Sequence, residues 1–171
     1  MDLVWKRFMN NRTFLLPDNR GEIILTGDVL SHINNFSQTS VFDKEAGGQL
    51  FSTTPNLSRV LISVATGPHK EDKRSRFSFN LDVTKAMQDR FSLFEKGLHP
   101  VGLWHTHPEK DPYPSKNDRL TTHNYLDAFQ GDMQGFLSVI IGNKRHPPNL
   151  VIWCAWKNKK HHWCKLEELS S

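Results

Sequence analysis

Cysteine and long apolar runs are scarce in this sequence, and each scarcity excludes a class of protein. The 171 residues include only Cys154 and Cys164, too few for the disulfide framework of a small secreted domain. No run of 18 apolar residues is present, which excludes a membrane-spanning helix. Residues 1–14 lack the apolar segment and cleavage site of a secretion signal. We therefore expect a cytoplasmic protein with no membrane partner.

Internal repeats, low-complexity tracts and linkers are also absent, so residues 1–171 are predicted to form a single domain. The 11 Phe and 5 Trp residues are too many aromatics for a disordered chain, although the mean hydropathy of −0.56 is on the polar side. A domain of this size buries roughly 70% of the surface of its unfolded chain, so it needs neither disulfides nor a structural metal to fold.

The chain carries a net charge of +4, and its basic residues concentrate in two short stretches, 70–76 and 157–162. Clustered Lys and Arg suit nucleic acid, and Trp153, Trp156 and Trp163 add aromatic surface. The stretches are short and separate, however, and these Trp residues lie in apolar strand patterns typical of core or interface packing. Solvent-exposed loops are the favoured interpretation, an acidic protein partner is a second, and nucleic acid is not the expected partner.

Hydrophobic periodicity and turn signals predict a mixture of strands and helices without strict alternation. Helices are expected over 28–36, 82–94 and 115–129, the second with an apolar stripe of Val83, Ala86, Met87, Phe91 and Phe94. The fold class is therefore α+β, or a mixed three-layer arrangement of the α/β/α kind. Strands are expected over 22–25, 46–51, 60–65, 101–107, 136–141, 150–156 and 162–166, residues 1–16 form an edge strand or an arm, and 70–76 and 108–114 are loops.

The segment from His105 to Asp118 carries the chemistry. His105 and His107 are two apart in an expected strand, so both imidazoles leave the same face of the sheet. Ser115 and Asp118 share the first turn of the helix that follows. Two imidazoles and one carboxylate leave a fourth tetrahedral position for water, which is typical of a catalytic zinc site, although Co²⁺, Mn²⁺ or Fe²⁺ also suit these donors.

Each half of this pattern also has an ordinary interpretation. A His-x-His pair in a strand is often plain polar decoration, and Ser115-x-x-Asp118 resembles a helix capping box with Asp in place of the usual Glu or Gln. The combination of all four positions in register is much rarer than either half alone, which favours the metal site.

The spacing His105-x-His107-x7-Ser115-x2-Asp118 resembles the JAMM signature of the MPN/JAB metallopeptidases. That signature has an acid before a glycine-containing strand, and Glu45, followed by Ala-Gly-Gly, occupies this place. Spacing alone does not select Glu45 over the other acids, namely Glu22, Glu71, Glu95 and Glu109. The resemblance covers almost the whole chain, and in detail the chain is most similar to the prokaryotic JAB branch. It implies a cytidine-deaminase-like curved sheet flanked by helices.

The resemblance implies a zinc peptidase in which His105, His107 and Asp118 hold Zn²⁺. Glu45 then transfers the proton and Ser115 hydrogen-bonds the oxyanion. The implied substrate is the bond after the C-terminal glycine of a ubiquitin-like protein, bound as an extended tail. Compact members of this branch are similar to deconjugating enzymes of bacterial antiphage operons, including CBASS. A sulfur-carrier processing peptidase and a non-catalytic MPN scaffold stay open as alternatives.

Two further groups of residues enter as hypotheses. Arg74 and Arg76 lie where the family often carries a substrate-facing insertion, and we expect them to grip the incoming modifier, with a solvated loop as the alternative. A second, structural zinc site across the last hairpin is a weaker possibility, because no Cys-x-x-Cys spacing supports it. Its residues would be Cys154, His161, His162 and Cys164.

Overall fold

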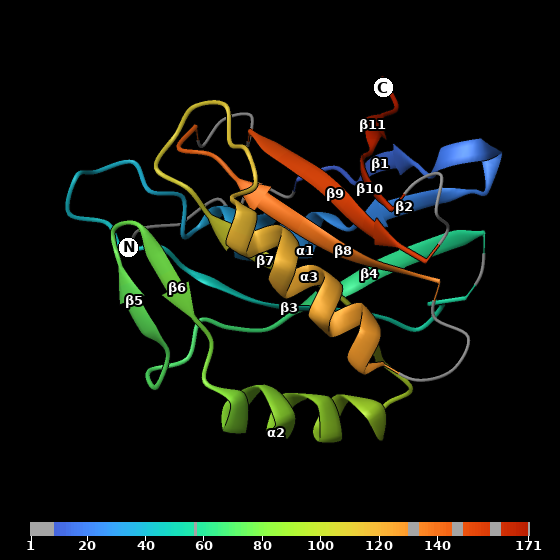
Figure 1. The fold of residues 1–171 in the computed structure, drawn as a ribbon, viewed down its shortest axis with the longest axis horizontal. Helices are drawn as coiled ribbons and strands as arrows, with labels where there is room; N and C mark the ends of the chain where they lie inside the picture. The colour runs from blue at the N-terminus through green and yellow to red at the C-terminus, as the bar shows by residue number, and fades with distance from the viewer. Residues whose placement is uncertain (1–8, 57, 130–133, 145–148, 158–161, 171) are drawn as a thin grey trace, which may run out of the picture.

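A computed structural model describes residues 9–56, 58–129, 134–144, 149–157 and 162–170. One nine-stranded sheet has the order β10-β9-β8-β7-β3-β4-β2-β1-β11, and β5 and β6 form a separate two-stranded hairpin. Three helices flank the sheet, which confirms the predicted α+β class (Figure 1). The strands are β1 (Arg12–Leu15), β2 (Glu22–Leu25), β3 (Gly47–Ser52), β4 (Arg59–Ala65), β5 (Lys73–Ser75), β6 (Ser78–Asn80), β7 (His99–Thr106), β8 (Gly135–Ile141), β9 (Leu150–Trp156), β10 (Trp163–Lys165) and β11 (Glu167–Glu168), and the helices are α1 (Gly27–Asn34), α2 (Val83–Phe94) and α3 (Lys116–Ala128).

The sheet curves until its two ends nearly meet. β10 and β11 are separated in the chain by Leu166 alone, yet they pair with β9 and β1 at opposite ends of the strand order. The Leu166 N–H donates to the carbonyl of Ile152, and the Leu166 side chain is buried in the core. The C-terminal segment thus closes most of the gap between the first and the last strand.

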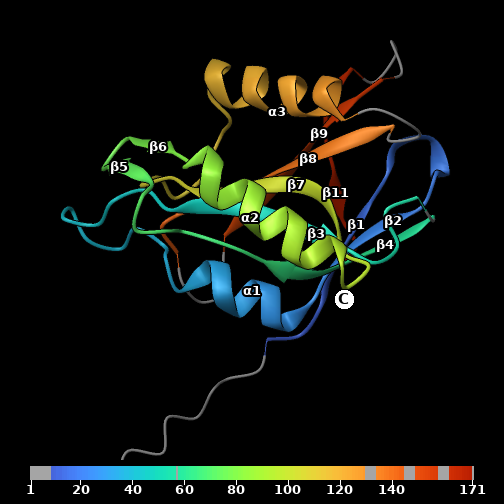
Figure 2. The same cartoon turned by 90° about the horizontal axis from the view of Figure 1, so that it is seen from below.

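The helices cover the sheet on two sides. Figure 2 shows the sheet between α1 and α3, which agrees with the predicted three-layer arrangement. Helix α1 packs on β4, and its buried residues Leu30 and Ile33 join Trp104 of β7 in the main core. Helix α3 packs on β8 and β9, where Leu126 contacts Phe136 and Ala155.

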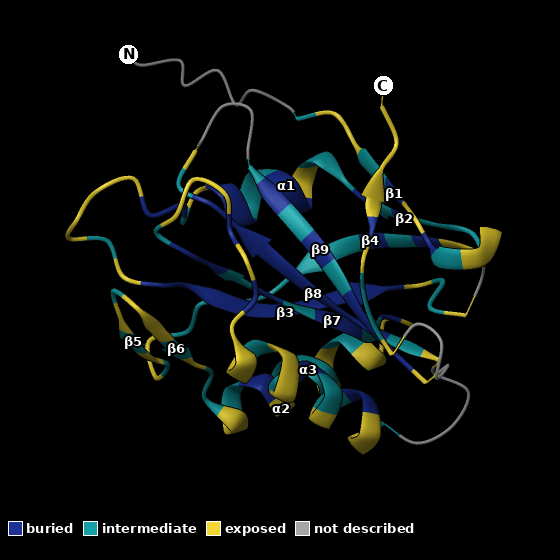
Figure 3. Ribbon diagram, turned by 45° about the horizontal axis from the view of Figure 1, so that its top comes forward, coloured by how far each residue is buried: buried dark blue, intermediate teal, exposed yellow. Residues whose placement is uncertain are grey.

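Helix α2 is bound to the sheet by few contacts. Its predicted span is confirmed, but its apolar stripe faces outward, because only Ala86 is buried while Val83 and Phe91 are 65% and 70% exposed. Polar side chains make the attachment instead: the amide of Gln49 in β3 donates to the Ala86 carbonyl, and Arg90 Nε donates to Gln49 Oε1. Figure 3 shows which residues of α2 and the other helices are exposed and which are buried.

Two local predictions differ from the structure. Residues 70–76 are predicted to be a loop, but Lys73–Ser75 pair with Ser78–Asn80 in a hairpin. The charged residues of this segment gave no apolar alternation from which a strand could be predicted. Strand β1 is not an edge strand, because β2 and β11 flank it. The remainder of the arm, residues 1–8, and the turn at 158–159 lie outside the described residues.

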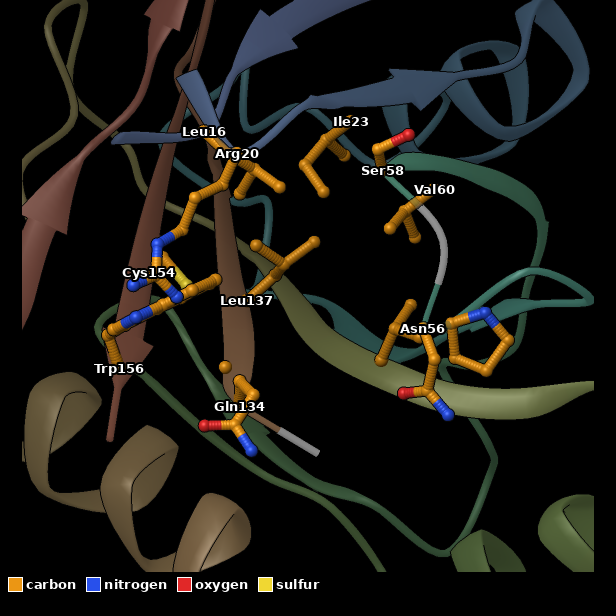
Figure 4. A pocket seen from close by; sticks show the side chains of 13 residues that line it. Leu16, Arg20, Ile23, Asn56, Ser58, Val60, Gln134, Leu137, Cys154 and Trp156 are labelled. Atoms are coloured by element: carbon orange, nitrogen blue, oxygen red, sulfur yellow. The ribbon is translucent and has the colours of Figure 1, made fainter. Parts of the chain in front are cut away.

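The two cysteines lie directly opposite each other on β9 and β10, and neither forms a disulfide. Cys154 is buried and lines an apolar cavity of about 490 Å³ inside the curve of the sheet, with Leu137 and Trp156 (Figure 4). Burial raises the pKa of both thiols, Cys154 more than Cys164. Within the described ranges, Cys154, Cys164 and His162 do not form a metal-binding group, and His161 lies outside those ranges. Among the described residues, no helix is both long and apolar enough to cross a membrane.

Candidate metal centre

The C-terminal end of β7 brings His105 and His107 together. This strand lies between β3 and β8 in the middle of the sheet, and the two imidazoles leave the same face, as their spacing predicts. Their Nε2 atoms are 3.1 Å apart. Thr106 points to the opposite face, where its hydroxyl accepts from the Ala46 N–H and donates to Gln38. Backbone pairing with β3 and β8 and the hydrogen bonds of Thr106 hold this part of the chain in place, so they fix the direction in which the two histidines point.

The first turn of α3 carries Asp118 to the two imidazoles. Asp118 Oδ1 lies 3.4 Å from His105 Nε2, and Oδ2 lies 3.6 Å from His107 Nε2. The Ser115 N–H donates to Asp118 Oδ2 at 2.6 Å, and the Asp118 N–H donates to Ser115 Oγ. Ser115 and Asp118 therefore form a helix capping box, and that capping box orients the Asp118 carboxylate toward the histidines, as a metal ligand requires.

The donors fit a divalent metal ion. One ligand atom from each of His105, His107 and Asp118 lies within 4.8 Å of the others, and the three side chains are only 11 to 17% exposed. Two imidazole Nε2 atoms that face one carboxylate form a compact N₂O set of the kind that Zn²⁺ prefers. Among the described residues this is the only such group of three or more side chains.

Charges in this group are strongly coupled. Burial would raise the pKa of Asp118. Hydrogen bonds from His105, His107 and the Ser115 backbone, together with the charge of His105, outweigh burial and hold that pKa far below its ordinary value. Burial lowers the pKa of His107, whereas its hydrogen bond to Asp118 and the charges of Asp118, Glu45 and Glu109 raise it, with a net increase. The carboxylate is thus ionised throughout the neutral range, as a metal ligand must be.

Glu45 lies just before β3 and lines the same cleft as the three predicted ligands. It is 7% exposed, and its backbone N–H donates to the carbonyl of Ser75 in the hairpin. Burial raises the pKa of Glu45 to about 7, while His107 opposes the increase and Asp118 and Glu109 add to it.

The structure separates Glu45 from the other acids that spacing left open. Glu22 pairs with Arg59 and Glu71 lies 3.5 Å from Lys85, both outside the cleft. Glu95 is exposed at the end of α2, also outside the cleft. Glu109 also lines the cleft, 3.3 Å from His107 Nδ1, but its side chain is 58% exposed. Glu45 is therefore the buried carboxyl group beside the metal centre.

Two glycines let neighbouring groups approach β3 next to the centre. A Cβ at Gly48 would lie 1.8 Å from the carbonyl oxygen of Thr66, and a Cβ at Gly47 would lie 2.6 Å from the ring of Phe79. Neither approach leaves room for a side chain at these two positions. Because Phe79 belongs to β6, the hairpin can rest directly on the strand that follows Glu45.

The guanidinium groups of Arg74 and Arg76 bind backbone in this structure. Arg74 Nε donates to the carbonyl of Glu45 at 2.6 Å, and Arg76 Nη1 donates to the carbonyl of Ser40 at 3.0 Å. Both contacts tie the hairpin to the segment that carries Glu45. The expected grip on a substrate stays a prediction, and the contacts indicate a positioning role for Arg74.

The cleft beside the centre has a volume of about 580 Å³. Strand β6 forms one wall and α3 the other, and no local sequence pattern indicates most of the lining residues. Phe79 and Tyr125 give it aromatic surface, and Asn117 and Ser138 are polar. These residues come from three separate elements, β6, α3 and β8, so only their packing brings them together.

Comparisons with known proteins identify the family. A family model described as "Prokaryotic homologs of the JAB domain" matches residues 31–158, a range that includes all five positions of the signature. The chain therefore belongs to the prokaryotic JAB family, as the resemblance implied, and its curved sheet flanked by helices is the JAB fold.

Curated relatives include a Pseudomonas aeruginosa (strain BWHPSA011 / Pa011) protein that is 34% identical over 73% of this chain and 80% of that protein. An Escherichia coli (strain TW11681) protein is 26% identical over 61% of this chain and 69% of that protein. Both are named CD-NTase/cGAS isopeptidase. The solution structure of protein DSY2949 from Desulfitobacterium hafniense is similar with a TM-score of 0.59 and 17% identity, over 85% of this chain and 88% of that one, which supports the fold alone.

Proposed function

We propose that this chain is a zinc-dependent isopeptidase that hydrolyses the amide bond after the C-terminal glycine of a ubiquitin-like or similarly conjugated protein. The observation that carries the proposal is the convergence of His105, His107 and Asp118 beside the buried carboxyl group of Glu45. Zinc, when bound by these three side chains, supplies Lewis acidity and lowers the pKa of a water molecule toward neutrality.

Glu45 moves the proton in the proposed reaction. Its carboxylate accepts a proton as water attacks the carbonyl carbon, and then donates that proton to the amine nitrogen as the C–N bond breaks. Burial raises the pKa of Glu45 in the metal-free chain, and a carboxyl group with a raised pKa is better suited to accept and return a proton near neutral pH.

Ser115 is proposed to stabilise the charge that forms on the substrate carbonyl oxygen. Its Oγ accepts the Asp118 N–H, so the hydroxyl proton can be donated to another acceptor. Ser115 lines the cleft next to Asp118, which places that donor close to the metal centre.

The substrate tail is proposed to bind along β6. In the described part of the chain, β6 pairs only with β5, so its other edge has free backbone donors and acceptors. Residues Ser78, Phe79 and Asn80 of β6 line the cleft. An extended C-terminal tail can therefore add to the hairpin as a strand and reach the metal centre.

The biological setting is also part of the proposal. The names of the relatives support deconjugation of a CD-NTase-like protein in a bacterial antiphage system of the CBASS kind. We place the enzyme in the cytoplasm and propose no nucleic-acid substrate. Sulfur-carrier processing would use the same site, and a substrate panel with ubiquitin-like and sulfur-carrier fusions separates the two.

The test is metal analysis beside a cleavage assay. We expect about one zinc per chain, lost in Asp118→Ala and kept in Glu45→Gln, with cleavage of a ubiquitin-like fusion by the native chain only. Zinc retained in Asp118→Ala would contradict the assigned ligands. Neither metal nor cleavage after zinc reconstitution would leave a non-catalytic scaffold as the function.

A further inference from the structure

A second cavity, lined in part by cationic side chains, lies on the other side of α3 from the metal centre. It has a volume of about 600 Å³ and lies between this helix and the ends of β9 and β10. Lys116, Arg119 and His123 line it from α3, and Lys157 and His162 line it from the strand ends. Asp118, Thr121 and Tyr125 instead line the metal cleft, so the helix separates the two cavities.

Positive charge in this cavity is not neutralised. No ion pair forms at Lys116, Arg119 or Lys157 within the described ranges, and Asp127 is the one acid among the described lining residues. Burial lowers the pKa of His123, and nearby His162 and Arg119 lower it further, against the opposing effect of Asp127. The cavity is therefore an electropositive site that favours an anion.

Flat rings lie next to these charges. The imidazoles of His123 and His162 stack with centroids 4.1 Å apart and an interplanar angle of 17°. The His123 ring is also 5.7 Å from Trp163, over which the Arg119 guanidinium lies at 6.0 Å. His123 Nε2 is buried and has no hydrogen-bond partner among the described residues, so a ligand in the cavity could supply one.

We propose that this cavity binds a nucleotide, with the phosphate on Lys116, Arg119 and Lys157 and the base against His162. A cluster of cations beside stacked rings matches both parts of a nucleotide, whereas a carboxylate of an acidic protein would use the cations alone. The volume is sufficient for one nucleotide. The same chemistry is offered by a free nucleotide and by one residue of a single strand. This inference does not depend on the proposed isopeptidase activity.

The test is binding of AMP, and of a fluorescein-labelled oligothymidylate of about 12 nucleotides, to the full chain, repeated in EDTA to remove binding through a metal ion. The double variant Arg119→Glu/Lys157→Glu is expected to weaken both at least about tenfold. The control Lys70→Glu/Lys96→Glu makes the same change in net charge at exposed positions outside the cavity. It is expected to change both affinities less than about twofold.

A stacking variant separates a nucleotide site from a plain phosphate site. His162→Ala is expected to weaken AMP about fivefold or more and to leave pyrophosphate binding unchanged. AMP binding that competes with the oligonucleotide assigns the site to free nucleotides as well, and binding of the oligonucleotide alone assigns it to single strands. Equal losses in the control variant, no effect of His162→Ala on AMP, or binding of polyglutamate in place of both probes would overturn the proposal.

Folding of each variant is checked by its thermal unfolding temperature. If Arg119→Glu/Lys157→Glu unfolds early, Arg119→Gln/Lys157→Gln removes the same two charges without adding acids, and a loss of at least about threefold is then expected. An unchanged affinity in that folded variant would also overturn the proposal.

Discussion

Glu45 is buried and lies near two other acidic side chains, Asp118 and Glu109. Burial and these two charges raise its pKa, to about 7 in the metal-free protein, with burial the larger cause. We expect carbon NMR of the Glu45 carboxyl group in the metal-free chain to show a midpoint near pH 7. Zinc should move the midpoint downward, because a nearby cation favours the ionised form. A midpoint close to the ordinary 4.5 in the metal-free chain would contradict the buried position.

The role of Glu45 predicts a pH profile for cleavage. Above its pKa the carboxylate is ionised and can accept a proton, so the rate should fall as the pH falls through that pKa. Glu45→Gln should keep the metal and lose at least about 100-fold in kcat, with no acid limb left in the profile. Full turnover by this variant would assign the proton transfer to another group, with Glu109 the next to examine.

Ser115 has a structural and a proposed catalytic role, and a matched variant separates them. Ser115→Ala removes the N-cap of α3 and should cost about 1 kcal/mol in urea unfolding. Thr26→Ala removes the N-cap of α1 and should cost a similar amount. We expect only Ser115→Ala to lower kcat, because α1 does not line the cleft. Equal activity in the two variants would limit Ser115 to capping.

At the level of elements, the hairpin β5–β6 connects Glu45 to the proposed substrate channel. If Arg74 positions Glu45 through its backbone carbonyl, Arg74→Ala should lower kcat about tenfold with little change in KM, and should shift the pH limb of Glu45. If Arg74 instead binds the substrate, KM should rise and should increase with salt in the native enzyme. Steady-state kinetics at two salt concentrations distinguish these outcomes.

Helix α2 exposes apolar side chains that begin at the cleft, since Val83 lines it and Met87 and Phe91 follow at intervals of four residues. We expect this stripe to contact the folded body of the substrate. Met87→Ser/Phe91→Ser should raise KM about fivefold for a folded ubiquitin-like fusion but not for a short peptide tail. Leu169→Ser, at an exposed apolar residue outside the cleft, is the control. Equal effects on both substrates would contradict this docking.

The elements also show what local sequence can and cannot predict. Caps and periodicity place the three helices, and the spacing of His105 and His107 gives the shared face, because these are properties of short segments. The hairpin was missed because its alternation is short and charged. The outward direction of the α2 stripe was missed because Gln49 and Arg90, which attach the helix, are 41 residues apart in the chain.

At the scale of the whole molecule, closure of the sheet depends on Leu166, which lies between the two end strands, β10 and β11. Leu166 is 4% exposed and lies in the main core. Leu166→Ala should reduce the free energy of unfolding by about 2–5 kcal/mol, since it leaves a cavity where β10 passes to β11. Leu169→Ala, at an exposed position, should change it by less than about 0.5 kcal/mol. Urea unfolding checks both, and similar small losses would show that closure contributes little.

This closure could not be predicted from the sequence, whereas the family and its signature could. Residues 163–168 contain two short strands that look like one continuous segment, and their partners lie at opposite ends of the chain. The signature residues, in contrast, are recognisable because each keeps a fixed chemical role at a fixed spacing. Glu45 required the resemblance, since its burial depends on the hairpin and not on its neighbours in sequence.

The three candidate ligands belong to two bodies, with His105 and His107 fixed in the centre of the sheet and Asp118 carried by α3. Any displacement of this helix moves the carboxylate but leaves the imidazoles in place. The affinity for a metal ion at this site would therefore depend on the distance between helix and sheet, and a bound ion would in turn hold the helix at one distance. By the reciprocity of linked equilibria, whatever pulls on the outer face of α3 changes the strength of the metal site by the same free energy with which the metal resists it.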